Sequence, residues 1–522
     1  MSSLMKALRI LPLLLPICPL SAVPLPEARV VTTDYHGVKV DDPYRYFEDR
    51  ENPEVAAWAR ALTEKSLAAL SKVPERAEIM KIIESADAVQ GDRVGWVAQP
   101  RPGEYFFLMR RQGEQVEQLF HQKPGGKPDL VLDPRKIVDG KGSPVTIKHF
   151  SVSPDVKHLA VAITSGGEDA DLYVVALADG KVTEGPFSRA RWGPAEWLPD
   201  SSGFLYNRLQ DLAPDADPLQ KFQKGLVQHH RLGTAEKDDR AVFGFGTQDG
   251  TDVKPADIVS LSPMGGSGWV LSSNGTGVSS DDIHHIARLD EVIAGTAKWR
   301  KICDRSHLVG SMGGGAVELH GDHIYILSRK EAPNGRVLRM SLDELDFAKA
   351  ETIYTAPRGS IQGIKVAREG LYVRYLDGGP SSLVRLRWAA LDKPEAITMP
   401  GDGRISLHGN IGAYPDLDGI GVSFSSWTGP TRLLRIPAEG TGTQPLDLPQ
   451  QVEPPISKEL VSRETTMHGH DGVEIPVSII HRKDLPKDGK RPVLLGAYGA
   501  YGISIEPGFR PSDAAICDMG HH

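Results

Sequence analysis

The sequence predicts a mainly β protein whose largest part is a seven-bladed β-propeller. Three observations favour this fold class: a turn-rich composition, a recurring turn-and-strand pattern, and the absence of a long amphipathic pattern between residues 89 and 447. Gly and Pro contribute 54 and 39 of the 522 residues, which is typical of short strands joined by tight turns. A chain of this length is also expected to form more than one domain.

A turn followed by an apolar strand recurs seven times in the central region. The apolar segments are residues 105–109, 159–163, 204–206, 269–271, 324–327, 371–373 and 420–424. Their spacing of about 50 residues suits a four-stranded blade, which buries its faces only by packing against neighbouring blades. This period favours seven blades over a double β-sandwich. We therefore place the propeller at residues 89–447, with the first and last blades adjacent.

Residues 1–22 have the features of a cleaved signal peptide. Lys6 and Arg9 precede an apolar stretch, residues 10–20, that is too short to span a bilayer, and residues 21–22 (Ser-Ala) offer a cleavage site. A hydrophobic anchor is the alternative. We expect an exported protein, periplasmic or secreted, with no stable membrane insertion after cleavage.

Residues 23–88 predict an N-terminal helical arm. Asn52 can cap a helix that has Pro53 at its first position, and apolar residues then recur at helical spacing. A second helix is expected to open at Pro74. We interpret this arm as a helical cap on a neighbouring domain.

Residues 448–522 differ from the propeller in pattern. Residues 464–468 and 474–481 predict two strands joined at His470-Asp471-Gly472, which is a hairpin signal. Pro492–Gly496 is a continuous apolar run before a Gly-rich loop, as expected of a strand covered on both faces. This order is typical of the start of a catalytic α/β domain.

Composition argues against several functional classes. The net charge of −8 is mild and argues against nucleic acid as a partner. Three widely spaced cysteines provide neither a disulfide framework nor a metal cluster. The pairs His229-His230 and His284-His285 lack the spacing of a zinc-binding helix, and His468 with His470 has no third ligand nearby. We therefore expect solvated turn histidines, no metal site and no cofactor.

Several segments resemble the prolyl oligopeptidase family of serine peptidases. They are residues 35–49, 150–155, 197–201, 471–477 and 497–504, the last reading Ala-Tyr-Gly-Ala-Tyr-Gly-Ile-Ser. The resemblance implies a propeller placed over an α/β-hydrolase domain, where it restricts entry to short peptides. The last segment resembles the oligopeptidase B branch as much as the prolyl branch, so the residue preferred before the cleaved bond stays open.

The same resemblance implies roles for two tyrosines. Tyr498 matches the residue that donates a hydrogen bond to the oxyanion of the tetrahedral intermediate, which a preorganised donor stabilises. Tyr501 matches an aromatic position of the substrate pocket. The alternative for each is a loop aromatic that packs without taking part in chemistry.

The nucleophile that this family requires is missing from the sequence. No Gly-x-Ser-x-Gly elbow occurs, and Gly265–Trp269 and Gly502–Glu506 match that pattern only in part. Ser512, Asp513 and His521 follow the order of a catalytic triad, but so short a span cannot place three groups on separate elements. We therefore expect the truncated start of an α/β-hydrolase (peptidase) domain at residues 448–522.

These observations together predict a serine endopeptidase of short peptides by family, represented here by a part that is inactive alone. Two alternatives remain open. The first alternative is a non-catalytic propeller that binds peptides. The second is one half of a split peptidase whose hydrolase segment acts in trans. The DNA that follows the codon for His522 would distinguish them.

Overall fold

The computed structural model describes residues 26–518, apart from positions 50, 90, 139–143, 168, 214–215, 248–249, 278–280, 312–314, 408–416, 487 and 501. The predicted signal peptide, Tyr501 and His521 lie outside the described residues. No helix in the described part of the chain is long and apolar enough to cross a membrane. The chain divides into two compact units, Met1–Lys81 and Ile82–His522, which are described separately.

The first unit combines a hairpin with a long helix. Its elements are β1 (Val31–Tyr35), β2 (Val38–Asp42) and α1 (Pro53–Leu70). Asn52 caps α1 as predicted, because its side-chain oxygen accepts a hydrogen bond of 3.0 Å from the backbone N–H of Glu54. Phe47 packs edge-on against Trp58, with ring centroids 5.2 Å apart. The second helix, α2 (Arg76–Val89), begins two residues later than the predicted start at Pro74.

Strands β3 to β30 form seven four-stranded antiparallel sheets, which we call blades 1 to 7. The strands of the first four blades are β3 (Arg93–Arg101), β4 (Glu104–Arg110), β5 (Gln118–Gln122), β6 (Asp129–Leu132); β7 (Thr146–Val152), β8 (His158–Thr164), β9 (Asp171–Ala176), β10 (Val182–Phe187); β11 (Glu196–Trp197), β12 (Gly203–Arg208), β13 (Leu226–Arg231), β14 (Arg240–Gly244); β15 (Ile258–Met264), β16 (Trp269–Gly275), β17 (Ile283–Arg288) and β18 (Arg300–Cys303). A short helix, α3 (Leu289–Ala294), follows β17.

The last three blades have the same arrangement. Their strands are β19 (Val317–His320), β20 (His323–Ser328), β21 (Arg336–Ser341), β22 (Glu351–Thr355); β23 (Ser360–Ala367), β24 (Gly370–Leu376), β25 (Ser381–Arg387), β26 (Ala390–Ala396); β27 (Arg404–Ser406), β28 (Ile420–Ser425), β29 (Arg432–Ile436) and β30 (Gln444–Pro445). Within every blade, consecutive strands pair in sequence order, so each blade is one continuous stretch of chain. The prediction of a seven-bladed propeller is confirmed.

Each of the seven apolar segments found in the sequence forms the second strand of one blade: β4, β8, β12, β16, β20, β24 or β28. A second strand has a hydrogen-bonded neighbour on each side and a neighbouring blade against each face, which favours a continuous apolar run over alternation. Phe106, Val161 and Phe204 on these strands are fully buried. The repeated pattern therefore marks the core of each blade.

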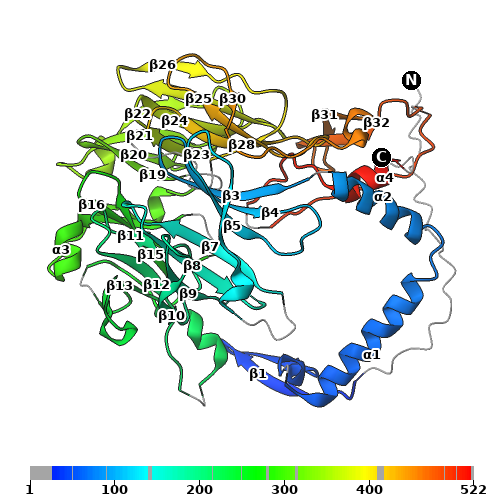
Figure 1. Cartoon of the computed structure of the whole chain (residues 1–522), viewed down its shortest axis with the longest axis horizontal. Coiled ribbons are helices and arrows are strands. Elements are labelled where there is room, and N and C mark those ends of the chain that lie inside the picture. Colours follow the sequence, from blue (N-terminus) through cyan, green and yellow to red (C-terminus); the bar gives the residue numbers. More distant parts are fainter. Residues whose placement is uncertain are drawn as a thin grey trace. The chain divides into compact units, whose positions relative to one another are not determined.

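The ring closes between blades 1 and 7 through side chains. Tyr105 and Phe107 of blade 1 share an apolar cluster with Leu433 of blade 7 and with Leu446, which follows it. Figure 1 shows the blue strands β3 and β4 beside the orange strand β28. Because each sheet takes all of its strands from one stretch of chain, this closure depends on side-chain packing and not on a shared sheet.

A hairpin and a helix follow the propeller. Strands β31 (Leu460–His468) and β32 (Glu474–Arg482) pair along their whole length around Gly472, so the predicted hairpin is confirmed, with a longer first strand. Helix α4 (Pro511–Asp518) packs on this hairpin, as the red and orange elements of Figure 1 show. Ala514 and Cys517 of α4 share an apolar cluster with Leu460.

The predicted strand at Pro492–Gly496 is wrong. These residues are irregular, and the side chains of Val493, Leu494 and Leu495 are 67–75% exposed. A strand needs a neighbour that satisfies its backbone groups. The nearest sheet in sequence, β31–β32, has only two strands, and no described residue pairs with this segment.

The expectation of solvated turn histidines is confirmed at the β31–β32 turn, where His468 and His470 are exposed, but it does not hold for the paired histidines. They lie on strands β13 and β17, and His230, His284 and His285 are at most 4% exposed. Burial lowers the pKa of His285 to about 4, helped by the charge of Lys301. The paired histidines are buried because they lie on inner strands of their blades, where neighbouring strands and blades cover the side chains.

His230 forms an ionic contact between blades 2 and 3. Its Nδ1 lies 2.7 Å from Asp239 Oδ1, and its Nε2 lies 2.6 Å from Glu184 Oε2. Carboxylates only accept hydrogen bonds, so both ring nitrogens donate, and only the imidazolium form can do so. Burial alone would lower the pKa of His230, but the hydrogen bonds from its ring to Asp239 and Glu184 raise it.

Candidate functional site

One face of the propeller carries the segment after blade 7. Antiparallel strands alternate in direction, so the loop between the second and third strands of every blade emerges where the fourth strand ends. The chain leaves β30 on this face, which we call the exit face. Gly379, in the β24–β25 loop, lies so close to the hairpin that an added Cβ would be 2.9 Å from Glu464 Oε2 and from Ser478 Oγ. The hairpin β31–β32 therefore packs on the exit face at blade 6.

A buried ion pair fixes the Gly-rich loop region to the same blade. The side chain of Arg374, 2% exposed, contacts the carboxylate of Glu506 through Nη2. Ser381 Oγ lies 2.9 Å from Glu506 Oε2 and 3.0 Å from Arg374 Nη2, which completes a three-residue network. A buried charge requires such a partner, because desolvation without one is costly. Residues 497–506 are thus anchored at one end to β24 and β25.

The two tyrosines singled out in the sequence are placed differently. Tyr498 lies in the irregular segment before Gly499, with its side chain 55% exposed and its hydroxyl without a hydrogen bond inside the described part of the chain. Tyr501 is outside the described residues. An exposed, unpaired hydroxyl is what a donor to an incoming ligand requires, but no described group stands opposite it as a nucleophile.

The serines considered from the sequence are not positioned for catalysis. Ser267 lies in the hairpin turn between β15 and β16, and its Oγ donates to the backbone oxygen of Met264 at 2.5 Å. Ser512 and Asp513 occupy the first turn of α4, with their side chains 3.3 Å apart. The partial elbow and the short triad-like run are therefore ordinary turn and helix residues here.

A serine–histidine pair that sequence reasoning missed is also unsuited to chemistry. Ser272 Oγ lies 3.5 Å from His285 Nδ1 on adjacent strands of blade 4. Both residues are at most 1% exposed, so no substrate reaches them. The cysteine of α4 is similarly unreactive, because burial raises the pKa of the Cys517 thiol and Asp513 adds to the effect.

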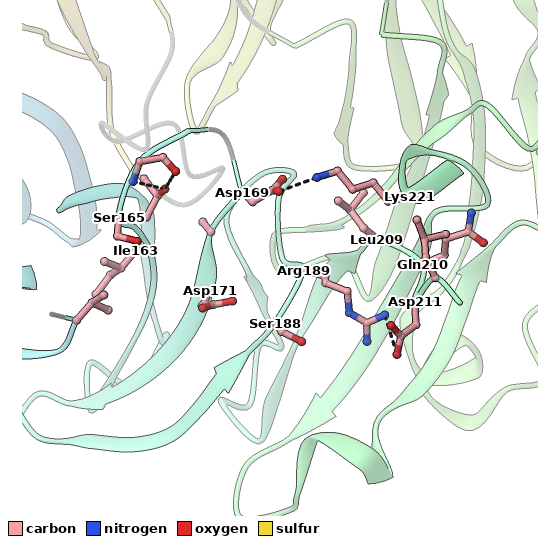
Figure 2. A pocket seen from close by; sticks show the side chains of 15 residues that line it. Ile163, Ser165, Asp169, Asp171, Ser188, Arg189, Leu209, Gln210, Asp211 and Lys221 are labelled. Atoms are coloured by element: carbon pink, nitrogen blue, oxygen red, sulfur yellow. Dashed lines mark hydrogen bonds and ion pairs between the residues drawn. The ribbon is translucent and has the colours of Figure 1, made fainter. Parts of the chain in front are cut away.

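A cavity of about 530 Å³ opens between blades 2 and 3, on the exit face. It is lined by the β8–β9 loop, the β10–β11 connection, the β12–β13 loop and Val138 of the β6–β7 connection, and Figure 2 shows its polar side chains. Lys221 Nζ lies 2.8 Å from Asp169 Oδ2, and Arg189 Nη1 lies 3.5 Å from Asp211 Oδ2. Ile163 and Leu209 add apolar wall. This size is within the range of sites that hold small ligands or peptide side chains.

Sequence reasoning could have found only part of this arrangement. Arg374 continues the apolar run of β24, and a charge in such a run indicates a buried partner. Glu506, its partner, is 132 residues away and has no local signal. The cavity is formed by connections that are separated in the sequence, and no local sequence pattern predicts it.

The fold and the exit-face segment define a β-propeller that carries a separate hairpin and helix after its last blade. The sequence profile described as prolyl oligopeptidase, N-terminal beta-propeller domain, matches residues 24–446. The chain belongs to the prolyl oligopeptidase family.

Curated relatives and solved structures agree with this assignment. A prolyl endopeptidase of Elizabethkingia meningoseptica is 23% identical over 510 residues, which cover 95% of this chain and 67% of that protein. The dual function macrocyclase-peptidase POPB of Amanita bisporigera is 22% identical over 516 residues, which cover 91% of this chain and 66% of that protein. The chain thus spans about two thirds of the length of these relatives.

Two solved structures show the same fold. One, from an analysis of two prolyl endopeptidases, has a TM-score of 0.80 at 23% identity and covers 96% of this chain and 70% of its own. The other is prolyl oligopeptidase B from Galerina marginata, bound to a 25mer macrocyclization substrate. It has a TM-score of 0.79 at 18% identity and covers 95% of this chain and 70% of its own.

Proposed function

We propose that this chain supplies the peptide-admitting propeller and the oxyanion donor of a prolyl oligopeptidase-type serine endopeptidase acting on short peptides. The supporting observation is the anchoring of the loop after Tyr498 to the exit face through Arg374 and Glu506. That contact holds Glu506, at the end of the loop whose sequence resembles the family, against blade 6 of the propeller. Relatives named prolyl endopeptidase, and a neighbour bound to a peptide substrate, support the peptide as ligand.

In this proposal the hydroxyl of Tyr498 polarises the carbonyl of the cleaved bond, and Tyr501 lines the pocket beside it. A hydroxyl donor stabilises the developing oxyanion but does not attack the carbonyl. The nucleophile and its base belong to a hydrolase segment that the 522 residues do not contain, since no Gly-x-Ser-x-Gly occurs in them. This segment is supplied in the same polypeptide or in trans.

The first test uses residues 1–522 in their processed form. We expect binding of the blocked peptide acetyl-Ala-Nle-Pro-Ala-amide by calorimetry, no hydrolysis of prolyl- or arginyl-ended chromogenic peptides, and no labelling by a fluorophosphonate. Labelling that maps to a single serine would show that an unrecognised nucleophile exists. Failure of the peptide to bind would contradict the proposed role of the propeller.

The second test addresses Tyr498 in an enzyme completed with a hydrolase segment. Tyr498→Phe should lower kcat on the order of 10²-fold with little change in KM, because one oxyanion donor is lost. In residues 1–522 alone the same change should alter nothing. A completed enzyme that keeps full kcat after the substitution would assign Tyr498 to packing.

Two alternatives give different results in the same experiments. A purely binding propeller would bind the peptide yet show no activity with any hydrolase segment added. A split peptidase would gain activity when such a segment is mixed in as a separate polypeptide.

We also infer export, from the basic and apolar pattern of residues 1–22. Amino-terminal sequencing of the protein recovered from outside the cytoplasm should then begin at Val23. A start at Met1 would exclude cleavage.

A further inference from the structure

The cavity between blades 2 and 3 contains one carboxylate without an ionic partner among the described residues. Five ionisable side chains line it: Asp169, Asp171, Arg189, Asp211 and Lys221. Lys221 is paired with Asp169, and Arg189 with Asp211. The side chain of Asp171, at the start of β9, makes no hydrogen bond or ion pair with any described residue. Figure 2 shows the two pairs joined by dashed lines, with Asp171 apart from both.

The cations next to Asp169 do not pair with Asp171, because both contact Asp169. Its second carboxylate oxygen accepts a hydrogen bond of 2.9 Å from Arg191, so Asp169 is held between two cations. Burial raises the pKa of Asp171, and the nearby charges of Glu236 and Asp169 raise it further. The position is therefore one of negative potential in partly desolvated surroundings. A cation entering the cavity would give Asp171 the ionic partner that it lacks.

We propose that this cavity binds the positively charged group of a peptide, with Asp171 as its counter-charge. The ligand group is a cation that can donate hydrogen bonds. A Lys side chain or the peptide amino terminus supplies it as an ammonium group, and an Arg side chain supplies it as a guanidinium group. This inference rests on the proposed function, because it specifies which peptides the propeller favours. It concerns a site in the propeller, separate from Tyr498 and the loop that carries it.

The other walls suit such a ligand. Ile163, Leu209 and Leu212 provide apolar surface for the methylene stem of a long basic side chain. The hydroxyl of Ser188 has no hydrogen-bond partner among the described residues and can accept from an ammonium group. Arg189 does not repel the ligand strongly, since Asp211 already neutralises it.

The cavity lies on the same face of the propeller as the C-terminal segment. All the connections that line it emerge on the exit face, which also carries the hairpin and the Glu506 anchor. Blades 2 and 3 lie three blades away from blade 6 in either direction around the ring, so a peptide held near the Tyr498 segment must cross this face to reach the cavity. Its basic residue would enter between blades 2 and 3.

The test compares three peptides on processed 1–522 by calorimetry at low salt: acetyl-Ala-Lys-Pro-Ala-amide, acetyl-Ala-Nle-Pro-Ala-amide and unblocked Ala-Nle-Pro-Ala-amide. Norleucine matches the lysine stem without its charge. We expect the lysine peptide, the unblocked peptide or both to bind about 5–10-fold more tightly than the blocked norleucine peptide, and this preference to fall with added salt.

Asp171→Asn should abolish the preference, so that the charged peptides bind no more tightly than the blocked norleucine peptide. Asp392→Asn, which removes an exposed carboxylate from β26 of blade 6, is the matched control and should keep the preference. An unchanged melting temperature for Asp171→Asn shows that the fold is intact, and the salt dependence of the native protein tests the charge without any substitution.

The outcomes separate the two proposals. If the blocked norleucine peptide binds but no charged peptide is preferred, or if Asp171→Asn keeps the preference, the cation site is wrong and the propeller remains a peptide binder. If none of the three peptides binds, the proposed function and the cation site both fail.

Discussion

The propeller and the segment after it differ in how far their apolar side chains are buried. On the second strands of the blades, side chains such as Leu371 and Phe204 are fully buried by neighbouring blades. In the C-terminal segment, residues 448–518, Val493, Leu494 and Leu495 are as apolar as those strands and yet stay exposed. Apolarity in a sequence predicts burial only when the rest of the fold supplies a surface to pack against.

The difference comes from repetition. A blade meets a similar blade on each side, so a segment repeated seven times creates the partner that each copy needs. The C-terminal segment is a single hairpin and helix, joined to blade 6 by a few polar contacts around Glu506. We therefore expect substitutions in the two regions to differ sharply in effect.

The largest difference should appear in a matched pair of leucines. Leu371→Ala empties a fully buried position of blade 6 and should lower the free energy of unfolding by about 4 kcal/mol, through lost transfer energy and a residual cavity. Leu494→Ala removes an exposed side chain and should change it by less than about 0.5 kcal/mol. Chemical denaturation of both variants measures this, and equal losses would mean that residues 492–496 pack in solution.

The second prediction concerns the seam between blades 2 and 3. His230→Gln should lower the free energy of unfolding by about 3 kcal/mol, because it leaves Glu184 and Asp239 facing each other without the cation between them. The wild-type contribution also depends on pH. Since the pKa of His230 is raised by folding, the stabilisation is complete below the unfolded value of about 6.5 and is lost as the pH rises through the folded value.

The measurement is the difference in unfolding free energy between wild type and His230→Gln from about pH 5.5 to 9. That difference should be largest at the acid end and shrink as the pH rises. A difference that grows with pH would mean that the neutral imidazole is the stabilising form.

The sequence predicted the propeller more completely than the C-terminal segment. The seven apolar segments located every blade core, because a blade strand is recognised from local pattern and period alone. The cap at Asn52 and the hairpin at Gly472 were also local signals. The strand at residues 492–496 failed, because strand formation there depends on a partner.

The histidines and the site were hidden for a related reason. His230 is a polar residue, and its burial is explained only by Glu184 on a strand of the neighbouring blade and by Asp239 in the β13–β14 connection. The Arg374–Glu506 contact and the cavity around Asp171 likewise join residues that are distant in sequence. Resemblance to a family assigned Tyr498 a role, but the arrangement around it required the structure.

The third prediction tests how firmly the C-terminal segment is held. Glu506→Gln removes the charge opposite the buried guanidinium of Arg374 and should weaken docking of residues 497–518 by about 2 kcal/mol. Asp484→Asn, in a surface ion pair with Arg482, is the control and should cost less than about 0.5 kcal/mol. Hydrogen exchange should speed up in the C-terminal segment of Glu506→Gln while the blades keep their protection. Faster exchange throughout would show that the two regions unfold as one.

The smallest effect uses two native cysteines, one in each region. Cys303 is buried in blade 4, where burial raises its pKa to about 12, and Cys517 is buried where α4 packs on the hairpin. Neither thiol reacts without an opening of the structure, so alkylation by iodoacetamide reports how often each region opens. Because a small cluster holds α4 whereas complete blades enclose Cys303, Cys517 should be modified about tenfold faster in native protein. Mass spectrometry of peptides over time measures both rates, with urea-unfolded protein as the control in which the rates should converge. Equal native rates would mean that the C-terminal segment is as firmly integrated as a blade, and the contrast between the two regions would then be one of exposure alone.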